Sequence, residues 1–330
     1  MAPHAMVPPN YFDVVRHIDD GKSSSVYHCR DVRESDPSAA DVAIKFIPRG
    51  PETIDERVLR EVLIVRKLQH KHIVRFREAH LNSRHLCLVF DYVPGGNLEQ
   101  FVDSRGGTLP EHLARYFFQQ LVLGMDFLHR VPPYGIMNRD LKLRNILVDD
   151  PTSEFPILSI CDFGFGKERD PCVPTVSAVG TPFYFAPEIL YRSSWEMRYD
   201  GKMTDIHGMG VILYKMLYGE FPEFNETGGE TLEEKLLQLK VNTTKLDKSP
   251  PSLRALMLGL LEPVPSQRWS VDKVFKNEWF CLDLEEGSAA LRQYNDAMLA
   301  QYNQWEDSRR EVQSVERLKM MVNNARAEAL

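Results

Sequence analysis

The sequence lacks long apolar runs, and no stretch of it approaches the roughly 20 residues that a membrane-spanning helix needs. Its first residues, MAPHAMVPPNYFDVV, have no basic segment followed by an apolar one, so no secretory signal peptide is expected. It also lacks a basic excess, since 40 Lys and Arg stand against 47 Asp and Glu, for a net charge of -7. That balance provides no positive field for a nucleic acid. We therefore expect neither a membrane nor a nucleic acid among the partners.

Cysteine is scarce and irregularly spaced. An odd, scattered set of cysteines in a chain of 330 residues fits reduced thiols, so the expected location is cytoplasmic, nuclear or both. Hydrophobic residues make up 43% of the chain, which is enough to bury a large core, and the length suggests about two domains or lobes. The cysteines are Cys29, Cys87, Cys161, Cys172 and Cys281.

The chain changes character at the connector DYVPGGNL, where a proline and two glycines interrupt the pattern. Before it, short runs rich in β-branched and aromatic residues predict strands, and the apolar spacing in DERVLREVLIVRKLQ predicts one amphipathic helix over 55–69. After it the pattern is mostly helical. The predicted strands cover 24–31, 41–47 and 85–93, and the predicted later helices cover 111–130, 203–219, 232–240 and 253–261.

This pattern divides the chain into four parts. We expect a small β-rich lobe over 11–90, a hinge over 91–97, a larger helical lobe over 98–280 and a helical tail over 281–330.

Several short motifs follow one another in a fixed order. VAIK ends in Lys45 on a predicted strand, and Glu61 lies in the amphipathic helix. NRDLKLRN then supplies Asp140, Lys142 and Asn145, CDFG supplies Asp162, and APE supplies Glu188. Each residue alone would most simply be a surface charge or part of a turn. The ordered set resembles the signature of the eukaryotic protein kinases, and the resemblance runs from about Tyr11 to Phe280.

The resemblance implies a fold of the α+β class. The small β-rich N-lobe would carry one regulatory helix, and the larger C-lobe would be helical. It also implies ATP and Mg²⁺ as cofactors and protein substrates as partners.

The catalytic roles are also implied by the resemblance. Lys45 would hold the α- and β-phosphates of ATP and would be oriented by an ion pair with Glu61. Asp140 would accept and orient the substrate hydroxyl. Lys142 would neutralise the γ-phosphate and mark Ser or Thr as the acceptor. The remaining candidates are the metal ligands, Asn145 and Asp162, whose oxygens suit Mg²⁺.

The adenine is expected to dock on the hinge. Phe90 matches the gatekeeper residue, and backbone groups of Asp91 and Val93 would read the adenine edge. The glycine-rich loop, IDDGKSSSVY, departs from the family, because Asp19 and Ser24 replace two of its three usual glycines. We therefore expect weaker ATP affinity without loss of the site. The other residues expected to line the nucleotide site are Ile18, Asp19, Gly21, Val26, Ala43 and Leu147.

A closer resemblance is to the plant stress-activated Ser/Thr kinases that form the second subfamily of relatives of the yeast sucrose-non-fermenting kinase. The matching runs are ICDFGFGK, SAVGTPFYFAPEIL, YDGK and the tail segment QSVERLKMMVNNARAEA. It implies a phosphorylation switch at Ser177, with Arg139 pairing the phosphate, and control by an upstream kinase or phosphatase. It also implies that the tail helix packs on the regulatory helix. The apolar stripe of that tail helix would be Val315, Leu318, Val322 and Ala325.

Two departures bear on activity. Asn138 replaces the histidine that usually begins the catalytic loop, and His207 and Gly208 replace the usual Trp-Ser pair after Asp205. In the family the histidine belongs to a stack that here would run through Phe76, Val65, Phe163 and Asn138. Loss of the ring is expected to cost packing, roughly 1 kcal/mol, and to tune the enzyme without silencing it.

The predicted function is transfer of the ATP γ-phosphoryl group to protein Ser and Thr hydroxyls, in stress signalling. The alternative is a pseudokinase scaffold that binds nucleotide without efficient transfer, as Asn138, Asp19 and His207 would suggest. A small-molecule kinase is disfavoured, because GTPFYFAPE matches a ledge that binds peptides.

Overall fold

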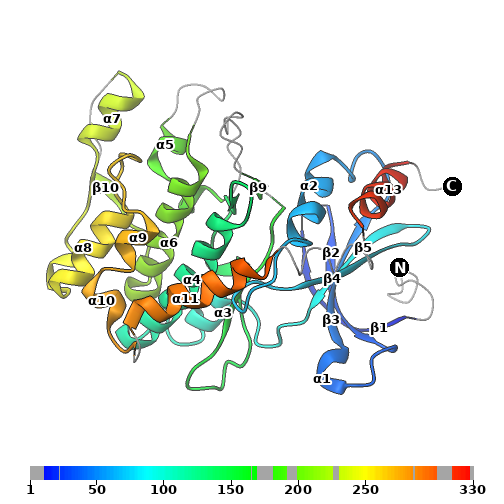
Figure 1. Ribbon diagram of the computed structural model, residues 1–330. Coiled ribbons are helices and arrows are strands. Elements are labelled where there is room, and N and C mark those ends of the chain that lie inside the picture. The colour runs from blue at the N-terminus through cyan, green and yellow to red at the C-terminus, as the bar shows by residue number, and fades with distance from the viewer. Residues whose placement is uncertain are drawn as a thin grey trace. The chain divides into compact units, whose positions relative to one another are not determined.

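The computed structural model describes residues 11–21, 23–164, 166–168, 181–191, 199–225, 230–284, 287–302 and 314–327. The chain forms two compact units, Met1–Pro94 with Ala300–Leu330, and Gly95–Leu299 (Figure 1). Each unit is described separately below. In the described ranges, every helix is too short or too polar to cross a membrane.

The first unit is built on an antiparallel sheet of five strands in the order β1-β2-β3-β5-β4. Its core lies between β1, β2, β3 and β5, with Val42, Ile44 and Val89 fully buried. A short helix, α1 (Pro37–Ala40), precedes β3. The strands are β1 (Phe12–Asp20), β2 (Ser25–Asp31), β3 (Asp41–Pro48), β4 (Phe76–Leu81) and β5 (His85–Asp91).

The helix of the first unit that was predicted to be regulatory is α2 (Glu56–Val65). It begins after Asp55, whose carboxylate accepts the N–H groups of Arg57 and Val58, as an N-cap residue does. The helix ends four residues earlier than the predicted 55–69. The reason is that Lys67 and Leu68 bond to the carbonyls three residues back, which is a tighter turn than the α-helix.

The tail returns to the first unit as α13 (Val315–Arg326), which packs on α2, β4 and β5. The predicted apolar stripe is confirmed for Leu318, Val322 and Ala325, which are buried, whereas Val315 is half-buried. Two backbone contacts fix its end. The N–H of Gly50 donates to the Ala325 carbonyl at 3.0 Å, and a guanidinium nitrogen of Arg49 donates to the Asn324 carbonyl at 2.8 Å.

The second unit is mostly helical and is organised around α4 (Glu111–Arg130) and α6 (Gly201–Tyr218), which contact each other and are buried over most of their length. The other helices are α3 (Leu98–Asp103), α5 (Pro187–Leu190), α7 (Leu232–Gln238), α8 (Pro251–Leu260), α9 (Val271–Val274), α10 (Glu278–Cys281) and α11 (Gly287–Ala300). The short strand pairs are β6 (Ile136–Met137) with β9 (Lys167–Glu168), β7 (Ile146–Val148) with β8 (Leu158–Ile160), and β10 (Phe224–Asn225) with β11 (Lys240–Val241).

The tail does not form one element. Except for its last residue, α11 belongs to the second unit, where the fully buried amide of Asn295 donates to the Leu123 carbonyl at 3.0 Å and to Asp126 at 2.8 Å. The later helix, α13, belongs to the first unit. The two halves of the segment 281–330 therefore stabilise different units.

Candidate active site

In the first unit, β3 and α2 bring together the predicted phosphate-binding pair. Nζ of Lys45 donates to Oε1 of Glu61 at 2.6 Å, and Glu61 is buried with 5% of its surface exposed. The predicted ion pair is therefore present. A buried carboxylate is costly unless it is paired, so Glu61 holds Lys45 firmly in one orientation.

The sheet register places the predicted nucleotide-binding residues on one face. Val26 lies opposite Lys45, and Ala43 lies opposite both His28 and Phe90. Directly opposed residues of an antiparallel pair share a face, and so do residues two apart on one strand. Val26, Ala43, Lys45 and Phe90 therefore point to the same side of the sheet.

The glycine-rich loop is a tight turn between β1 and β2. The N–H of Gly21 donates to the Ser24 carbonyl at 2.7 Å, and a Cβ at position 21 would lie 2.8 Å from Oγ of Ser24. Only glycine fits there without a shift of the serine. Ile18 and Asp19 are exposed at the end of β1, and one carboxylate oxygen of Asp19 accepts the N–H of Asp20.

The hinge follows β5 directly. The N–H of Asp91 donates to the Arg75 carbonyl at 2.9 Å, so it is already used within the sheet. Of the two backbone groups of Asp91, the N–H and the carbonyl, only the carbonyl is suited to bind the adenine edge. Val93 lies two residues further on in the hinge, and Leu147 lies in the second unit, in the middle of β7.

In the second unit, the carboxylate of Asp140 has three side-chain partners. Nζ of Lys142 donates to it at 2.7 Å, Oγ1 of Thr181 at 3.1 Å and Nδ2 of Asn145 at 3.1 Å. The Asn145 amide also donates to the Asp140 carbonyl at 2.9 Å. The carboxylate is thus fixed in orientation, which the predicted role of Asp140 in orienting a substrate hydroxyl requires.

The catalytic loop rests on Asp205 of α6. The two carboxylate oxygens of Asp205 accept the backbone N–H groups of Asn138 at 2.9 Å and Arg139 at 2.8 Å, and the His129 ring bonds to the same carboxylate at 2.9 Å. Arg139 adopts a φ of 66°, a left-handed conformation that is costly for a side chain of its size. These bonds to Asp205 offset that cost and hold Asp140 in place.

Asn138 itself is fully buried. Its Oδ1 accepts the N–H of Asp140 at 3.0 Å, whereas its Nδ2 has no partner in the described part of the chain. Of the predicted stack, Val65 and Phe76 are buried in the first unit, and Phe163 and Asn138 are buried in the second.

The predicted metal ligands flank the β7–β8 hairpin. Asn145 precedes β7, and its carbonyl accepts the N–H of Cys161 at 2.9 Å, so Asp162 follows β8 at the same end of the hairpin. Asp162 is exposed, with a φ of 59°. Because the Asn145 nitrogen is used by Asp140, its amide oxygen is the atom that remains for a cation. A carboxylate and an amide oxygen are ligands that fit Mg²⁺.

The described ranges contain no group of three or more His, Cys, Asp or Glu side chains arranged to hold a metal ion. Asp162 and Asn145 alone do not complete a coordination shell. This fits Mg²⁺, which usually keeps several waters and takes further ligands from substrate phosphates.

Two residues of this arrangement were not among the predicted site residues. The hydroxyl of Thr181 accepts from Lys142 at 3.0 Å and donates to Asp140. His129, in the last turn of α4, was missed altogether. The predicted switch residue Ser177 lies outside the described residues, and Arg139 is buried beside Asp140.

Glu188 and Arg268 form a structural ion pair in the second unit. Two nitrogens of Arg268 donate to the two carboxylate oxygens of Glu188, both at 2.8 Å, and both side chains are buried. Nearby, His207 is buried against the ring of Phe224. Burial, aided by the charge of Arg268, lowers the pKa of His207 well below its ordinary value. The ring is therefore neutral in the folded protein.

Comparison with known proteins agrees with this geometry. The model of the protein kinase domain family matches residues 12–280. The chain is 33% identical to the serine/threonine-protein kinase SRK2A of Physcomitrium patens, over 96% of this chain and 85% of that protein. It is 35% identical to SRK2E of Arabidopsis thaliana, over 83% and 72% of the two chains. It is 36% identical to SAPK9 of Oryza sativa, over 77% and 70%. The chain therefore belongs to the protein kinase family, as a serine/threonine protein kinase related to these plant kinases.

Proposed function

We propose that this kinase transfers the γ-phosphoryl group of Mg-ATP to Ser and Thr hydroxyls of proteins, with Asp140 orienting the acceptor. The observation that carries the proposal is the set of side-chain contacts on Asp140, at 2.7–3.1 Å from Lys142, Asn145 and Thr181. Phosphoryl transfer depends mainly on positioning and on charge neutralisation, and a carboxylate held on several sides supplies the first.

Each predicted residue has a role in this proposal. In the first unit, Lys45 binds the α- and β-phosphates, and its ion pair with Glu61 keeps the ammonium in place. In the second unit, Asn145 and Asp162 hold Mg²⁺. When bound, Mg²⁺ offsets the negative charge of the phosphates. Lys142, which is paired with Asp140, neutralises the γ-phosphate.

The adenine is proposed to dock on the hinge through the Asp91 carbonyl and the Val93 N–H. The 6-amino group of adenine donates and its ring nitrogen accepts, so these two backbone groups match it. Ile18, Val26, Ala43 and Leu147 provide apolar contacts. The exposed carboxylate of Asp19 lies at the rim of the phosphate region, which is the basis for expecting weaker ATP affinity.

Regulation by phosphorylation at Ser177 is part of the proposal, and so is a role in stress signalling. A phosphate there adds about two negative charges, which Arg139 would pair. The tail is proposed to be regulatory because α13 packs on α2, the helix that carries Glu61.

The pseudokinase alternative rests on Asn138, Asp19 and His207. A binding module without chemistry would be expected to lose Lys45, Asp140 or Asp162, and all three are present. The ion pair of Lys45 and the contacts of Asp140 also favour transfer over simple binding.

Incubation with labelled ATP, Mg²⁺ and generic protein substrates tests the proposal. Lys45→Met and Asp162→Ala are each expected to abolish transfer, whereas Lys71→Met, which removes an exposed lysine, serves as the matched control. Near-wild-type transfer by either site variant at saturating Mg-ATP would contradict the proposal. A Ser177→Ala protein that stays folded and loses most activity supports the switch, and full activity would remove it.

A further inference from the structure

The hinge of the first unit is held from outside by side chains that no catalytic role explains. Residues Tyr92 to Pro94 follow β5, which ends at Asp91, and belong to no helix or strand. Such a segment keeps a fixed backbone only when other groups restrain it. Two side chains of the hinge, those of Asp91 and Tyr92, are each bound by residues of the sheet.

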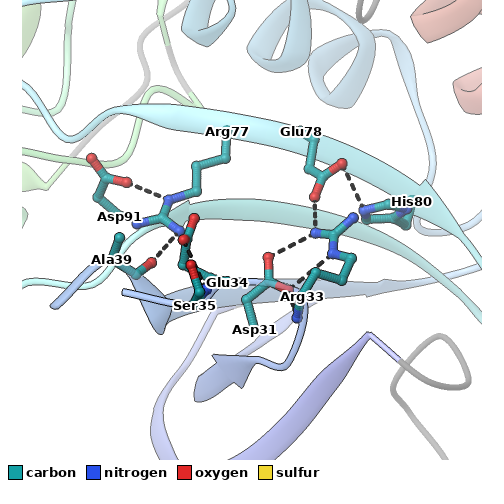
Figure 2. Close-up of polar contacts among 9 residues, drawn as sticks. All are labelled: Asp31, Arg33, Glu34, Ser35, Ala39, Arg77, Glu78, His80 and Asp91. Atoms are coloured by element: carbon teal, nitrogen blue, oxygen red, sulfur yellow. Dashed lines mark hydrogen bonds and ion pairs between the residues drawn. The ribbon is translucent and has the colours of Figure 1, made fainter. Parts of the chain in front are cut away.

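The first restraint comes from Arg77 on β4, as Figure 2 shows. Its Nε donates to Oδ1 of Asp91 at 2.5 Å, and its Nη1 donates to the Ala39 carbonyl at 2.6 Å (Figure 2). The guanidinium thus bridges the start of the hinge and the segment that precedes β3. Its side chain is 24% exposed, so the ion pair is partly shielded from water.

A break in the sheet register places Arg77 there. Phe76 pairs with Phe90, but the next described pair is Glu78 with Val89, so an extra residue is inserted in β4 at Arg77. Bulges of this kind redirect a side chain and are common beside active sites. Here the bulge lies next to the strand end from which the hinge begins.

The second restraint acts on Tyr92. Its ring stacks on the His28 ring, with centroids 3.8 Å apart and planes 5° from parallel. The hydroxyl accepts from Nη2 of Arg16 at 2.6 Å, and the ring of His28 is in turn bonded to Asp41 at 2.8 Å. His28 lies on the same face of the sheet as Val26 and Ala43, which belong to the proposed nucleotide site.

We infer that Arg77 and His28 are positioning residues, which together form a clamp that holds the hinge backbone ready for the adenine. The inference rests on the proposed docking of adenine at Asp91 and Val93. The N–H of Asp91 is fixed by Arg75 and its carboxylate by Arg77, so the direction of its carbonyl is set before the nucleotide arrives. Preorganisation of this kind strengthens binding by reducing the entropy lost on association.

The same region offers a matched control. Arg33 also bridges two carboxylates, those of Asp31 at the end of β2 and Glu78 on β4, and among the described residues it makes no bond to the hinge (Figure 2). Burial raises the pKa of Glu78, but bonds from His80 and Arg33 outweigh it and lower the pKa to about 2. Arg33→Met therefore removes a comparable ion pair without touching the hinge. Its effect measures the contribution of stability alone, which can be subtracted from the effect of Arg77→Met.

The experiment measures steady-state kinetics with ATP and with inosine triphosphate, in which a carbonyl oxygen replaces the 6-amino group. The full-length wild type is compared with Arg77→Met, His28→Leu and Arg33→Met. The wild type is expected to prefer ATP, because the Asp91 carbonyl repels the carbonyl of the analogue. Arg77→Met and His28→Leu are each expected to raise KM for ATP about fivefold, the size of a partly exposed charged contact.

The clamp also predicts what does not change. Arg77→Met and His28→Leu are each expected to lose most of the preference for ATP. Their kcat and their KM for the protein substrate are expected to stay within about twofold of wild type, because both residues are remote from the reacting atoms. Arg33→Met is expected to keep both the wild-type KM for ATP and the preference. Arg77→Lys, which retains the charge, is expected to restore part of the preference.

Three results overturn the inference. If Arg77→Met and Arg33→Met behave alike while the wild type prefers ATP, the clamp is wrong and hinge docking stands. If the wild type does not distinguish the two nucleotides, hinge docking is wrong and the clamp fails with it. If Arg77→Met does not fold, as judged by thermal melting, Arg77→Lys and His28→Leu decide, and an unchanged preference in both refutes the clamp.

Discussion

The side chain of Asn138 connects the first position of the catalytic loop to the third. Its oxygen accepts the N–H of Asp140, and its nitrogen is buried without a partner among the described residues. An unpaired buried amide nitrogen costs about 1–3 kcal/mol, which makes this loop less stable than the same loop fully bonded. The residue therefore both orients Asp140 and leaves the loop under some strain.

We predict that Asn138→His is active, with basal activity equal to or above wild type, whereas Asp140→Asn is nearly inactive. Histidine restores the ring that packs in this position, and no reacting group is lost. Asn138→Ala is expected to lose activity as well as stability, because it leaves the buried Asp140 N–H unpaired. Transfer at saturating Mg-ATP and thermal melting measure both effects. An inactive wild type that Asn138→His restores would establish the pseudokinase reading instead.

His207 makes the stability of the folded protein depend on pH. Its pKa is lowered by burial and by the charge of Arg268, while the unfolded chain has the ordinary value of 6.5. Between these two values the unfolded state binds more protons than the folded state, so stability rises with pH. The contribution is fully present above about pH 6.5 and is lost as the pH falls below it, until the lowered folded pKa is reached.

We predict that the wild type melts at a clearly lower temperature at pH 5.5 than at pH 7.5, and that His207→Phe reduces this difference. Phenylalanine keeps a ring against Phe224 and cannot be protonated. The exposed His112→Phe is the control and is expected to leave the pH profile unchanged. Identical pH profiles for wild type and His207→Phe would show that other groups cause the acid sensitivity.

At this scale the sequence predicted the charged residues of the site but not all of their partners. Lys45, Glu61 and Asp140 belong to short motifs that are readable locally. The bonds of Asp140 to Thr181 and of Asp205 to His129 join residues 41 and 76 positions apart. No local periodicity encodes such pairs, because they depend on how α4, α6 and the catalytic loop pack.

Among the elements, α13 has the clearest division between a buried and an exposed side. Leu318 is fully buried on α2 and the sheet, whereas Met320, two residues away, is 59% exposed. Both side chains are similar in size and both residues favour helices. Replacing each of them by alanine therefore changes helix propensity to a similar extent, and only the replacement of Leu318 removes buried packing.

We predict that Leu318→Ala lowers the melting temperature and the kinase activity, whereas Met320→Ala changes neither. Loss of a buried leucine costs about 2–5 kcal/mol, which is enough to release a short helix from its docking site. Limited proteolysis of the tail would detect the release. If Leu318→Ala is as active and as protected as Met320→Ala, the contact between α13 and α2 has no regulatory role.

The helices and strands were predicted well where residue composition and hydrophobic periodicity indicate the same structure. The helix over 111–130 was predicted with the bounds that it has, and β3 and β5 coincide closely with predicted strands. The sequence did not single out β4, because FREAHL mixes charged and apolar residues and lacks a continuous apolar run like LCLVF of β5. The bulge at Arg77 was also not predicted, since register depends on the partner strand.

At the scale of the whole molecule, both ends of the chain contribute to the first unit, and α11 contributes to the second. The amphipathic pattern of a helix identifies its buried side but not the surface that it covers. The separate destinations of α11 and α13 could therefore not be read from the tail sequence.

We predict that two truncations have different consequences. Ending the chain after residue 302 removes α13 and should increase amide hydrogen exchange only in α2, β4 and β5. Ending it after about residue 285 also removes α11 and should increase exchange in α4, where Leu123 and Asp126 lose Asn295. Both truncations should lower the melting temperature and the activity. The same exchange pattern in both proteins would contradict separate roles for the two helices.

The return of α13 to the first unit also affects how the protein is made. The first 94 residues leave the ribosome early in synthesis. The helix that covers Gly50 and the apolar sides of α2 and β5 can form only after residues 315–326 have emerged. At 5–20 residues per second, the roughly 200 intervening residues take about 10–40 s to synthesise. During that interval the growing chain presents an uncovered apolar surface, so the nascent first unit is a site where molecular chaperones would bind.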